Sequence, residues 1–188
     1  MTDIIGVVLT SVTQSEIRLT LEAVVALHNQ FRNEDVDTRV ALADRGFARA
    51  ARASDASIHR LERRILELHD LLQSLPELDV DEAIAQVNEV LTELAISPSV
   101  QAHDGVGPHL HWTPSTARFD EQVLADITMA LAFELCDNGV DRFGHCSASD
   151  CQDLFYDATR NRSRRFCDDP KCANRTHAAD HRARRRTS

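Results

Sequence analysis

The stretch CSASDCQDLFYDATRNRSRRFCDDPKCANR, residues 146–175, contains four of the five cysteines of this 188-residue chain. Cys146 and Cys151 have four residues between them, fifteen residues follow, and Cys167 and Cys172 repeat the same spacing. Two chelating pairs separated by a loop are typical of a structural zinc site, because Zn²⁺ binds four thiolates readily in tetrahedral geometry. The spacing therefore predicts one Zn²⁺ bound to these four cysteines.

Three other arrangements compete with a four-cysteine zinc site. Two disulfides need an oxidising compartment, and the N-terminus lacks a basic region followed by a signal-like apolar segment. A thiol redox site favours Cys-x-x-Cys, which the sequence lacks. A Cys2His2 site could use His177 and His181, four residues apart on an expected helix, but it would leave Cys146 and Cys151 without a role. The four-cysteine site is favoured over all three.

Composition indicates a folded protein of the cytoplasm. The chain is 43% hydrophobic and long enough for one or two domains. No apolar run approaches the roughly 20 residues of a membrane-spanning helix, so we expect no membrane partner. In a reducing compartment, clustered cysteines are more often metal ligands or redox groups than disulfides.

Charge is divided unevenly along the chain. Residues 1–137 have 10 Arg and no Lys against 23 Asp and Glu, a balance of −13. Residues 138–188 have 10 Arg and one Lys against 7 acidic residues, a balance of +4. An acidic body followed by a basic end is consistent either with a solvated terminus or with an anionic partner such as DNA, whose counterions Arg and Lys displace.

The acidic body is predicted to be mainly helical. Apolar residues recur close to a 3.6-residue period at 17–31, 58–75 and 84–94, so each stretch is expected to bury one face in a core. Ser15 and Ser54 are the expected caps at the start of the first two helices. Pro76 and Pro98 are expected to end the second and third helices. A last body helix is expected from Arg118 to Asp137, and Gly139 is expected to end it.

Between the third and the last of these helices the period changes. The segment SVQAHDGVGPHLHWTPS, residues 99–115, has turn signals at Asp104-Gly105 and Gly107-Pro108 between two short extended runs, which predicts a β-hairpin. His109 and His111 would share one face of a strand and are interpreted as a polar face in preference to a metal site. Cys136, on the last body helix, is expected to be a small core residue. The body lacks the common short catalytic motifs, and we expect no enzymatic activity.

The C-terminal segment resembles the CGNR zinc finger, a bacterial module named for a signature around its last cysteine. That signature appears here as Cys172-Ala173-Asn174-Arg175, with Ala173 in place of the family glycine. The LFYD step, the TRNRSRR run and the basic terminal helix agree as well. In that family the finger follows a helical domain called ABATE, grouped with stress-induced transcription regulators. The resemblance implies an ABATE-like domain over residues 1–138 and a finger over residues 139–188.

The expected fold class is mainly α: a helical N-terminal domain with a small β-hairpin, followed by a treble-clef-like zinc finger made of a short hairpin and a basic helix. Leu154, Phe155 and Tyr156 are extended-type residues that suggest the hairpin, while Asp168, Asp169 and Pro170 suggest the start of the helix. Arginine binds phosphate and guanine in bidentate fashion, and a basic helix fits the major groove. The predicted DNA contacts are Arg160, Arg162, Arg164, Arg165, Arg175, His177, Arg182, Arg184, Arg185 and Arg186.

Within this set the loop arginines are assigned to phosphates, and His177, Arg182 and Arg185 to bases. The alternative for Arg164 and Arg165 is a structural ion pair with Asp157 or Asp168. These expectations together predict a zinc-dependent DNA-binding transcription regulator whose acidic body senses a small-molecule inducer or forms a homodimer. The alternatives are a zinc-stabilised module that binds RNA or an acidic protein, and an enzyme in the body with the finger as an accessory.

Overall fold

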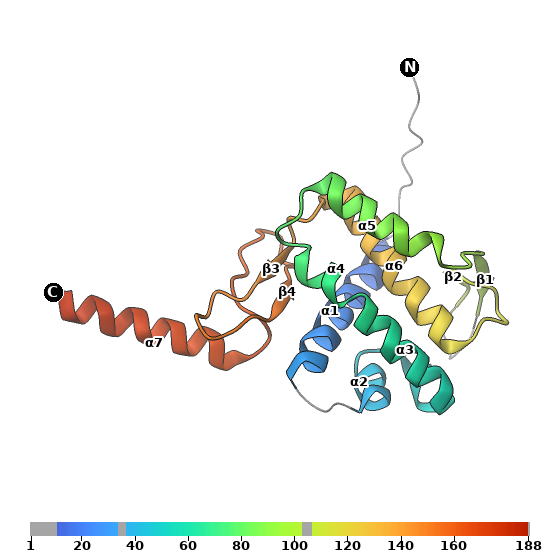
Figure 1. Ribbon diagram of the computed structural model, residues 1–188, viewed down its shortest axis with the longest axis horizontal. Coiled ribbons are helices and arrows are strands. Elements are labelled where there is room, and N and C mark those ends of the chain that lie inside the picture. The colour runs from blue at the N-terminus through green and yellow to red at the C-terminus, as the bar shows by residue number, and fades with distance from the viewer. Residues whose placement is uncertain (1–10, 34–36, 103–106, 188) are drawn as a thin grey trace, which may run out of the picture.

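The computed structural model describes residues 11–33, 37–102 and 107–187. The protein is mainly helical, with two separate two-stranded antiparallel sheets, which confirms the predicted fold class. Helices α1 to α6 form the body, and the last helix, α7 (Pro170–Thr187), extends away from it (Figure 1). Among the described residues, no helix combines the length and the apolar character needed to cross a membrane.

Helix α6 (Phe119–Asn138) is the centre of the body. It packs against α1 (Ser11–Asn33), α3 (Asp55–Glu67) and α5 (Val80–Thr92). Apolar side chains such as Val123, Ile127 and Leu131 are buried, and so are residues on other faces of the helix. A helix that is apolar nearly all round is expected to be enclosed by its neighbours. Its predicted end is confirmed, because Gly139 caps it with a φ of +62°.

The apolar stripe at 58–75 forms two helices and not one. Ser54 caps α3 as predicted, since its side chain accepts a hydrogen bond from the Ser57 N–H. The expectation of one helix up to Pro76 is wrong, because α3 ends at Glu67 and α4 (His69–Ser74) follows Leu68. Leu68 has a ψ of −6°, and this bend keeps the later leucines in the same core as those of α3.

Other helix ends differ from the expected positions. Ser15 lies inside α1 and does not cap it. Helix α5 ends at Thr92, well before Pro98, and begins with a capping box between Asp79 and Glu82. Two short elements had no clear sequence signal, α2 (Thr38–Asp44) and the 3₁₀ helix η1 (Ala48–Arg52).

The predicted body hairpin is confirmed. Strands β1 (Ser99–Gln101) and β2 (His109–His111) are antiparallel, with Val100 opposite Leu110. The predicted turn at Asp104-Gly105 lies outside the described residues. His109 and His111 share a face, with their Nε2 atoms 2.9 Å apart, and no third metal ligand joins them within the described ranges.

The prediction for Cys136 is wrong. Its side chain is exposed near the C-terminal end of α6. Because α6 is apolar on most of its surface, the sequence period could not show which face remains open to solvent. Cys136 is therefore separate from the buried core and from the other four cysteines.

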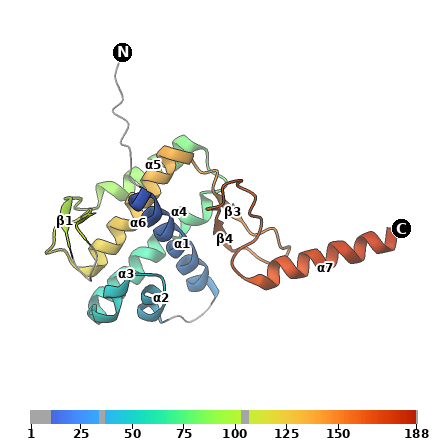
Figure 2. The same cartoon turned by 180° about the vertical axis from the view of Figure 1, so that it is seen from behind.

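Two further strands begin the C-terminal segment. Strand β3 (Phe143–His145) pairs with β4 (Leu154–Tyr156), as the LFYD step suggested. Phe143, Leu154 and Tyr156 belong to the same hydrophobic core as the body helices. The view from behind shows this hairpin beside the body and α7 leading away from it (Figure 2). The division between residues 138 and 139 stays a prediction, and the core runs across it.

Candidate metal centre

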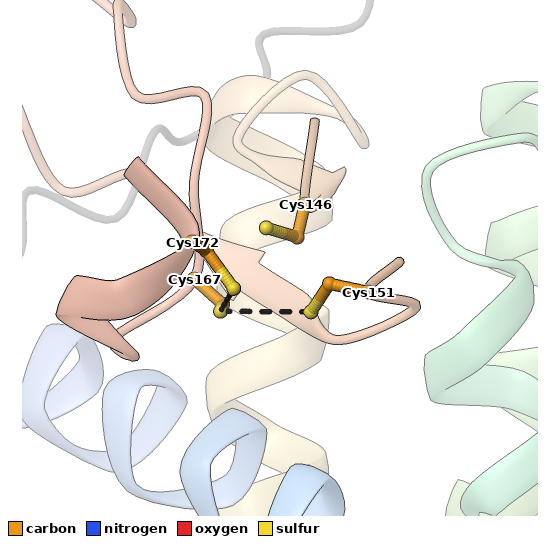
Figure 3. Close-up of side chains that lie close together, drawn as sticks. All are labelled: Cys146, Cys151, Cys167 and Cys172. Carbon is orange, nitrogen blue, oxygen red and sulfur yellow. Dashed lines mark hydrogen bonds between the residues drawn. The ribbon is translucent and has the colours of Figure 1, made fainter. Parts of the chain in front are cut away.

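Four cysteines from separate parts of the C-terminal segment meet at one point. The sulfur atoms of Cys146, Cys151, Cys167 and Cys172 all lie within 4.8 Å of one another. The Sγ atoms of Cys151 and Cys167 are 3.8 Å apart, and those of Cys167 and Cys172 are 3.7 Å apart. Figure 3 shows the side chains directed toward a common centre. This arrangement is a tetra-cysteine metal-binding site.

Local hydrogen bonds place each pair of cysteines. Cys146 and Cys151 lie in the turn between β3 and β4, where the Cys146 N–H bonds to the Asp153 carbonyl at 2.8 Å. Cys172 lies in the first turn of α7, and its N–H bonds to the Asp169 carbonyl at 3.1 Å. Helix α7 starts at Pro170, as predicted, because proline at the first helical position costs no hydrogen bond. The hairpin turn and the helix start therefore face each other across the site.

The distances between the sulfur atoms fit zinc. Zn–S bonds of about 2.3 Å in tetrahedral geometry separate neighbouring sulfur atoms by about 3.8 Å. The Cys151–Cys167 and Cys167–Cys172 sulfur separations, 3.8 and 3.7 Å, agree with that value, and the other sulfur pairs lie within 4.8 Å. Four thiolates with no oxygen ligand also favour zinc over magnesium or calcium, which prefer oxygen. The residues present thus suit Zn²⁺, and the four cysteines would hold it.

Burial disfavours the thiolate form of most of these cysteines unless a cation is bound. Burial raises the pKa of Cys151 to about 12 and also raises the pKa values of Cys167 and Cys172. Burial acts on Cys146 in the same direction, but hydrogen bonds from the Cys167 and Ala148 backbones outweigh it and lower its pKa. A bound divalent cation favours thiolate over thiol and offsets the cost of burial.

The competing arrangements of these residues are not the ones observed. The sulfur separations exceed the roughly 2.05 Å of a disulfide bond, and all five cysteines are free thiols. No histidine joins the four cysteines within the described ranges. The ring of His177 instead contacts that of Phe166 edge-on, with centroids 5.6 Å apart. The Cys2His2 alternative is therefore not supported.

The finger hairpin is attached to the body by hydrogen bonds that the sequence did not indicate. The Asn29 side chain donates to the Leu154 carbonyl at 2.8 Å and accepts from the Leu154 N–H at 2.9 Å. Arg32 donates to the Gln152 carbonyl at 2.7 Å, one residue after Cys151. The buried Tyr156 hydroxyl donates to Glu134 at 2.9 Å. Helices α1 and α6 thereby position the turn that contains the first cysteine pair.

Arg164 is built into the finger. Its Nε donates to the Phe166 carbonyl at 2.8 Å, and its Nη2 pairs with Asp168 at 2.6 Å. The guanidinium also lies over the Phe155 ring, 5.6 Å from its centroid. The structural alternative expected for this arginine is therefore present.

The other loop arginines differ in whether their guanidinium groups pair with residues of the protein or remain exposed. Arg162 pairs with Asp141 at 2.8 Å and has a φ of +46°. Arg165 is exposed and its guanidinium lies over the Phe166 ring at 5.8 Å, while Arg160 is also exposed. Arg160 and Arg165 are the loop arginines best placed to contact an external anion.

The arginines of α7 lie in two groups. Arg175, near the metal site, donates to Asp150 at 3.0 Å and to the Cys172 sulfur at 3.5 Å. Farther along, Arg182, Arg184 and Arg185 are exposed, whereas the side chain of Arg186 lies outside the described part. Ala173, which replaces the family glycine, is inside this regular helix, where alanine is well suited.

Comparison with known families agrees with this geometry. Residues 142–185 match the family model of the CGNR zinc finger. No curated protein is significantly similar to the chain. The match covers the four cysteines, both finger strands and most of α7. The chain therefore carries a zinc finger domain, similar to the CGNR zinc finger, with a tetra-cysteine metal-binding site.

Proposed function

We propose that the protein is a zinc-dependent DNA-binding transcription regulator whose finger contacts DNA. The observation that supports this most strongly is the exposure of α7. Beyond Thr176, every residue of the helix whose side chain is described is exposed, and arginines recur there. Isolated helices of this length are marginal in water, so an exposed basic helix is suited to binding an anionic surface such as a DNA groove.

Zinc would have a structural role in this proposal. A segment of about 45 residues rarely builds a sufficient core, and a bound metal supplies the missing folding energy. Cys172 would connect the first turn of α7 to the β3–β4 turn through the ion. The direction of α7 would then depend on zinc, and so would DNA binding.

We assign a role to each arginine from the contacts that its guanidinium already makes within the protein. Arg182 and Arg185, three residues apart, lie on one face of α7 and are proposed to reach bases together with His177. Arg160 and Arg165 are proposed to bind phosphates. Arg162, Arg164 and Arg175 keep a place in the predicted set, but their ion pairs within the finger make them positioning residues first.

Selection of bound fragments from genomic DNA with the zinc-loaded protein tests the proposal. We expect enrichment of a defined sequence, and an affinity that falls with salt and is lost after chelation. Arg182→Gln should weaken binding, whereas Arg63→Gln, which removes an exposed body arginine, should not. A preference for structured RNA or an acidic protein over duplex DNA would replace DNA as the partner.

We further propose that residues 1–138 form an ABATE-like body that forms a homodimer or senses an inducer in the cytoplasm, without catalysis. Support for self-association comes from Val100 and Leu110, which lie opposite each other on β1–β2 with exposures of 72% and 48%. Paired exposed apolar residues on a short sheet are suited to a symmetric contact.

A further inference from the structure

A cleft of about 580 Å³ on the body is lined by arginines. It lies between the η1–α3 segment and the start of α6, away from the metal site. We call it the arginine cleft, and the residues that matter here are Arg49, Arg52, Arg60, Arg118, Ser57 and Phe119.

The concentration of arginine is unusual for this part of the chain. Residues 1–137 contain only ten arginines against 23 acidic residues, yet four of the ten line this one cleft. Two of the four already have carboxylate partners, because Arg60 and Arg118 pair with Asp120 and Arg118 also pairs with Glu121 at 2.7 Å. Arg49 and Arg52 form no such pair within the described ranges, so the cleft keeps an excess of positive charge. A cleft that gathers positive charge on an acidic domain is suited to an anionic ligand.

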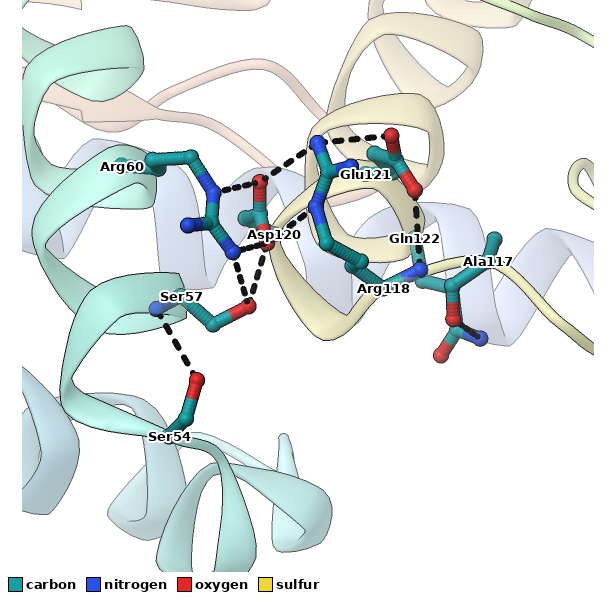
Figure 4. A network of polar contacts seen from close by, with 8 residues as sticks. All are labelled: Ser54, Ser57, Arg60, Ala117, Arg118, Asp120, Glu121 and Gln122. Carbon is teal, nitrogen blue, oxygen red and sulfur yellow. Dashed lines mark hydrogen bonds and ion pairs between the residues drawn. The ribbon is translucent and has the colours of Figure 1, made fainter.

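A buried carboxylate holds one side of the cleft in place. Asp120 is 6% exposed and accepts from Arg60 Nε at 3.0 Å and from Arg60 Nη2 at 3.1 Å (Figure 4). The Ser57 hydroxyl also donates to Asp120, and Arg118 approaches the same carboxylate at 3.5 Å. Arg60 is therefore fixed before any ligand arrives, which lowers the entropy cost of binding.

Several hydrogen-bond donors remain available at this cleft. Within the described part of the chain, Arg49 and Arg52 form no ion pair, although Arg49 Nη1 donates to the Gln122 side chain at 2.5 Å, and Arg60 Nη1 makes no hydrogen bond. Arg49 and Arg52 of η1 and Arg60 of α3 thus line one space.

We propose that the arginine cleft binds a phosphorylated small molecule. A phosphate dianion has three acceptor oxygens that can take guanidinium and backbone donors from several directions, whereas a single carboxylate accepts one arginine fork. The cleft is much larger than phosphate alone, and Phe119 and Ala53 supply apolar surface for an organic part. The ligand is therefore a phosphate monoester with an organic group of small-metabolite size.

Calorimetric titration of the full-length, zinc-loaded protein tests this without DNA. The probes are inorganic phosphate, glycerol 3-phosphate, AMP and citrate. We expect saturable binding of at least one phosphate monoester, tighter than inorganic phosphate and tighter than citrate. Arg52→Gln should weaken it roughly ten-fold or more, as expected for loss of a charged hydrogen bond.

Arg18→Gln is the matched control, because it removes an equal charge from an exposed site of α1 outside the cleft. It should leave the affinity unchanged. Equal weakening by both variants would show general charge attraction and overturn the site, as would no saturable binding of any monoester. Citrate binding more tightly than the monoesters would overturn the phosphate assignment. Each of these results leaves the proposed DNA binding by the finger unaffected.

Discussion

Replacing Arg164 should lower the folding stability of the finger, and this free-energy loss should exceed the loss from any single DNA contact. The side chain is 25% exposed and bonds to the carbonyls of Phe166 and Tyr156, at 2.8 and 3.3 Å, and to Asp168. A hydrogen bond with one charged partner contributes about 1.5–3 kcal/mol, and a pair with an exposed carboxylate less than about 1 kcal/mol. Stacking on Phe155 adds about 0.5–1 kcal/mol.

These contributions overlap, so Arg164→Gln should cost about 2–4 kcal/mol of finger stability. Arg165→Gln is the matched control, because this neighbouring arginine is exposed and its only described contact of this kind is the Phe166 ring. It should cost less than about 1 kcal/mol.

Zinc release to a competing chelator and thermal melting, measured beside DNA affinity, separate the two roles. Arg164→Gln should release zinc faster and melt earlier, whereas Arg165→Gln should keep zinc and lose only DNA affinity. An Arg164→Gln protein that retains zinc and its melting temperature but loses DNA binding would refute the structural assignment.

Three further predictions follow from the described contacts. In the zinc-loaded protein one thiol, Cys136, should react with iodoacetamide, and all five thiols should react after chelation in denaturant. Metal analysis should show that Cys146→Ser loses zinc, whereas the His177→Ala, His181→Ala double variant keeps it. Burial lowers the pKa of His28 to about 4, so the unfolded chain binds a proton first as the pH falls below 6.5. The contribution of His28 to stability, present above pH 6.5, should therefore fall by about 3 kcal/mol toward pH 4. Burial raises the pKa of Asp126 to about 7 and acts in the opposite direction, so the decline is measured as the difference between denaturant unfolding of the wild-type protein and of His28→Gln across this pH range. Light scattering should report a dimer at high concentration that Leu110→Ser weakens; a monomeric wild-type protein would contradict this.

Local features of the sequence predicted the site well. Cysteine spacing, Pro170 at a helix start, the Ser54 cap and Gly139 at a helix end each act within a few residues, so their physical effect is visible in the sequence itself. The sequence therefore identified the four cysteines that meet, the two hairpins and the basic helix.

Long-range features were not visible in the same way. Asn29 and Leu154 are 125 residues apart, and no local pattern marks an asparagine that will bond to a strand. The arginine cleft likewise unites η1, α3 and α6, whose arginines are scattered along the chain. The break at Leu68 depends on how the leucines meet the rest of the core, which a 3.6-residue period does not report.

The attachment of the finger hairpin to α1 and α6 makes α7 a lever. The hairpin shares the core of the body, whereas α7 continues for 18 residues, about 27 Å, and its described side chains beyond Thr176 are exposed. A tilt of about 5° at the metal site would move the far end of such a helix by about 2 Å, comparable to the tolerance of a hydrogen bond to a base. Small changes in the position of Asn29 or Glu134 are thus magnified along α7, where the exposed arginines are most closely spaced.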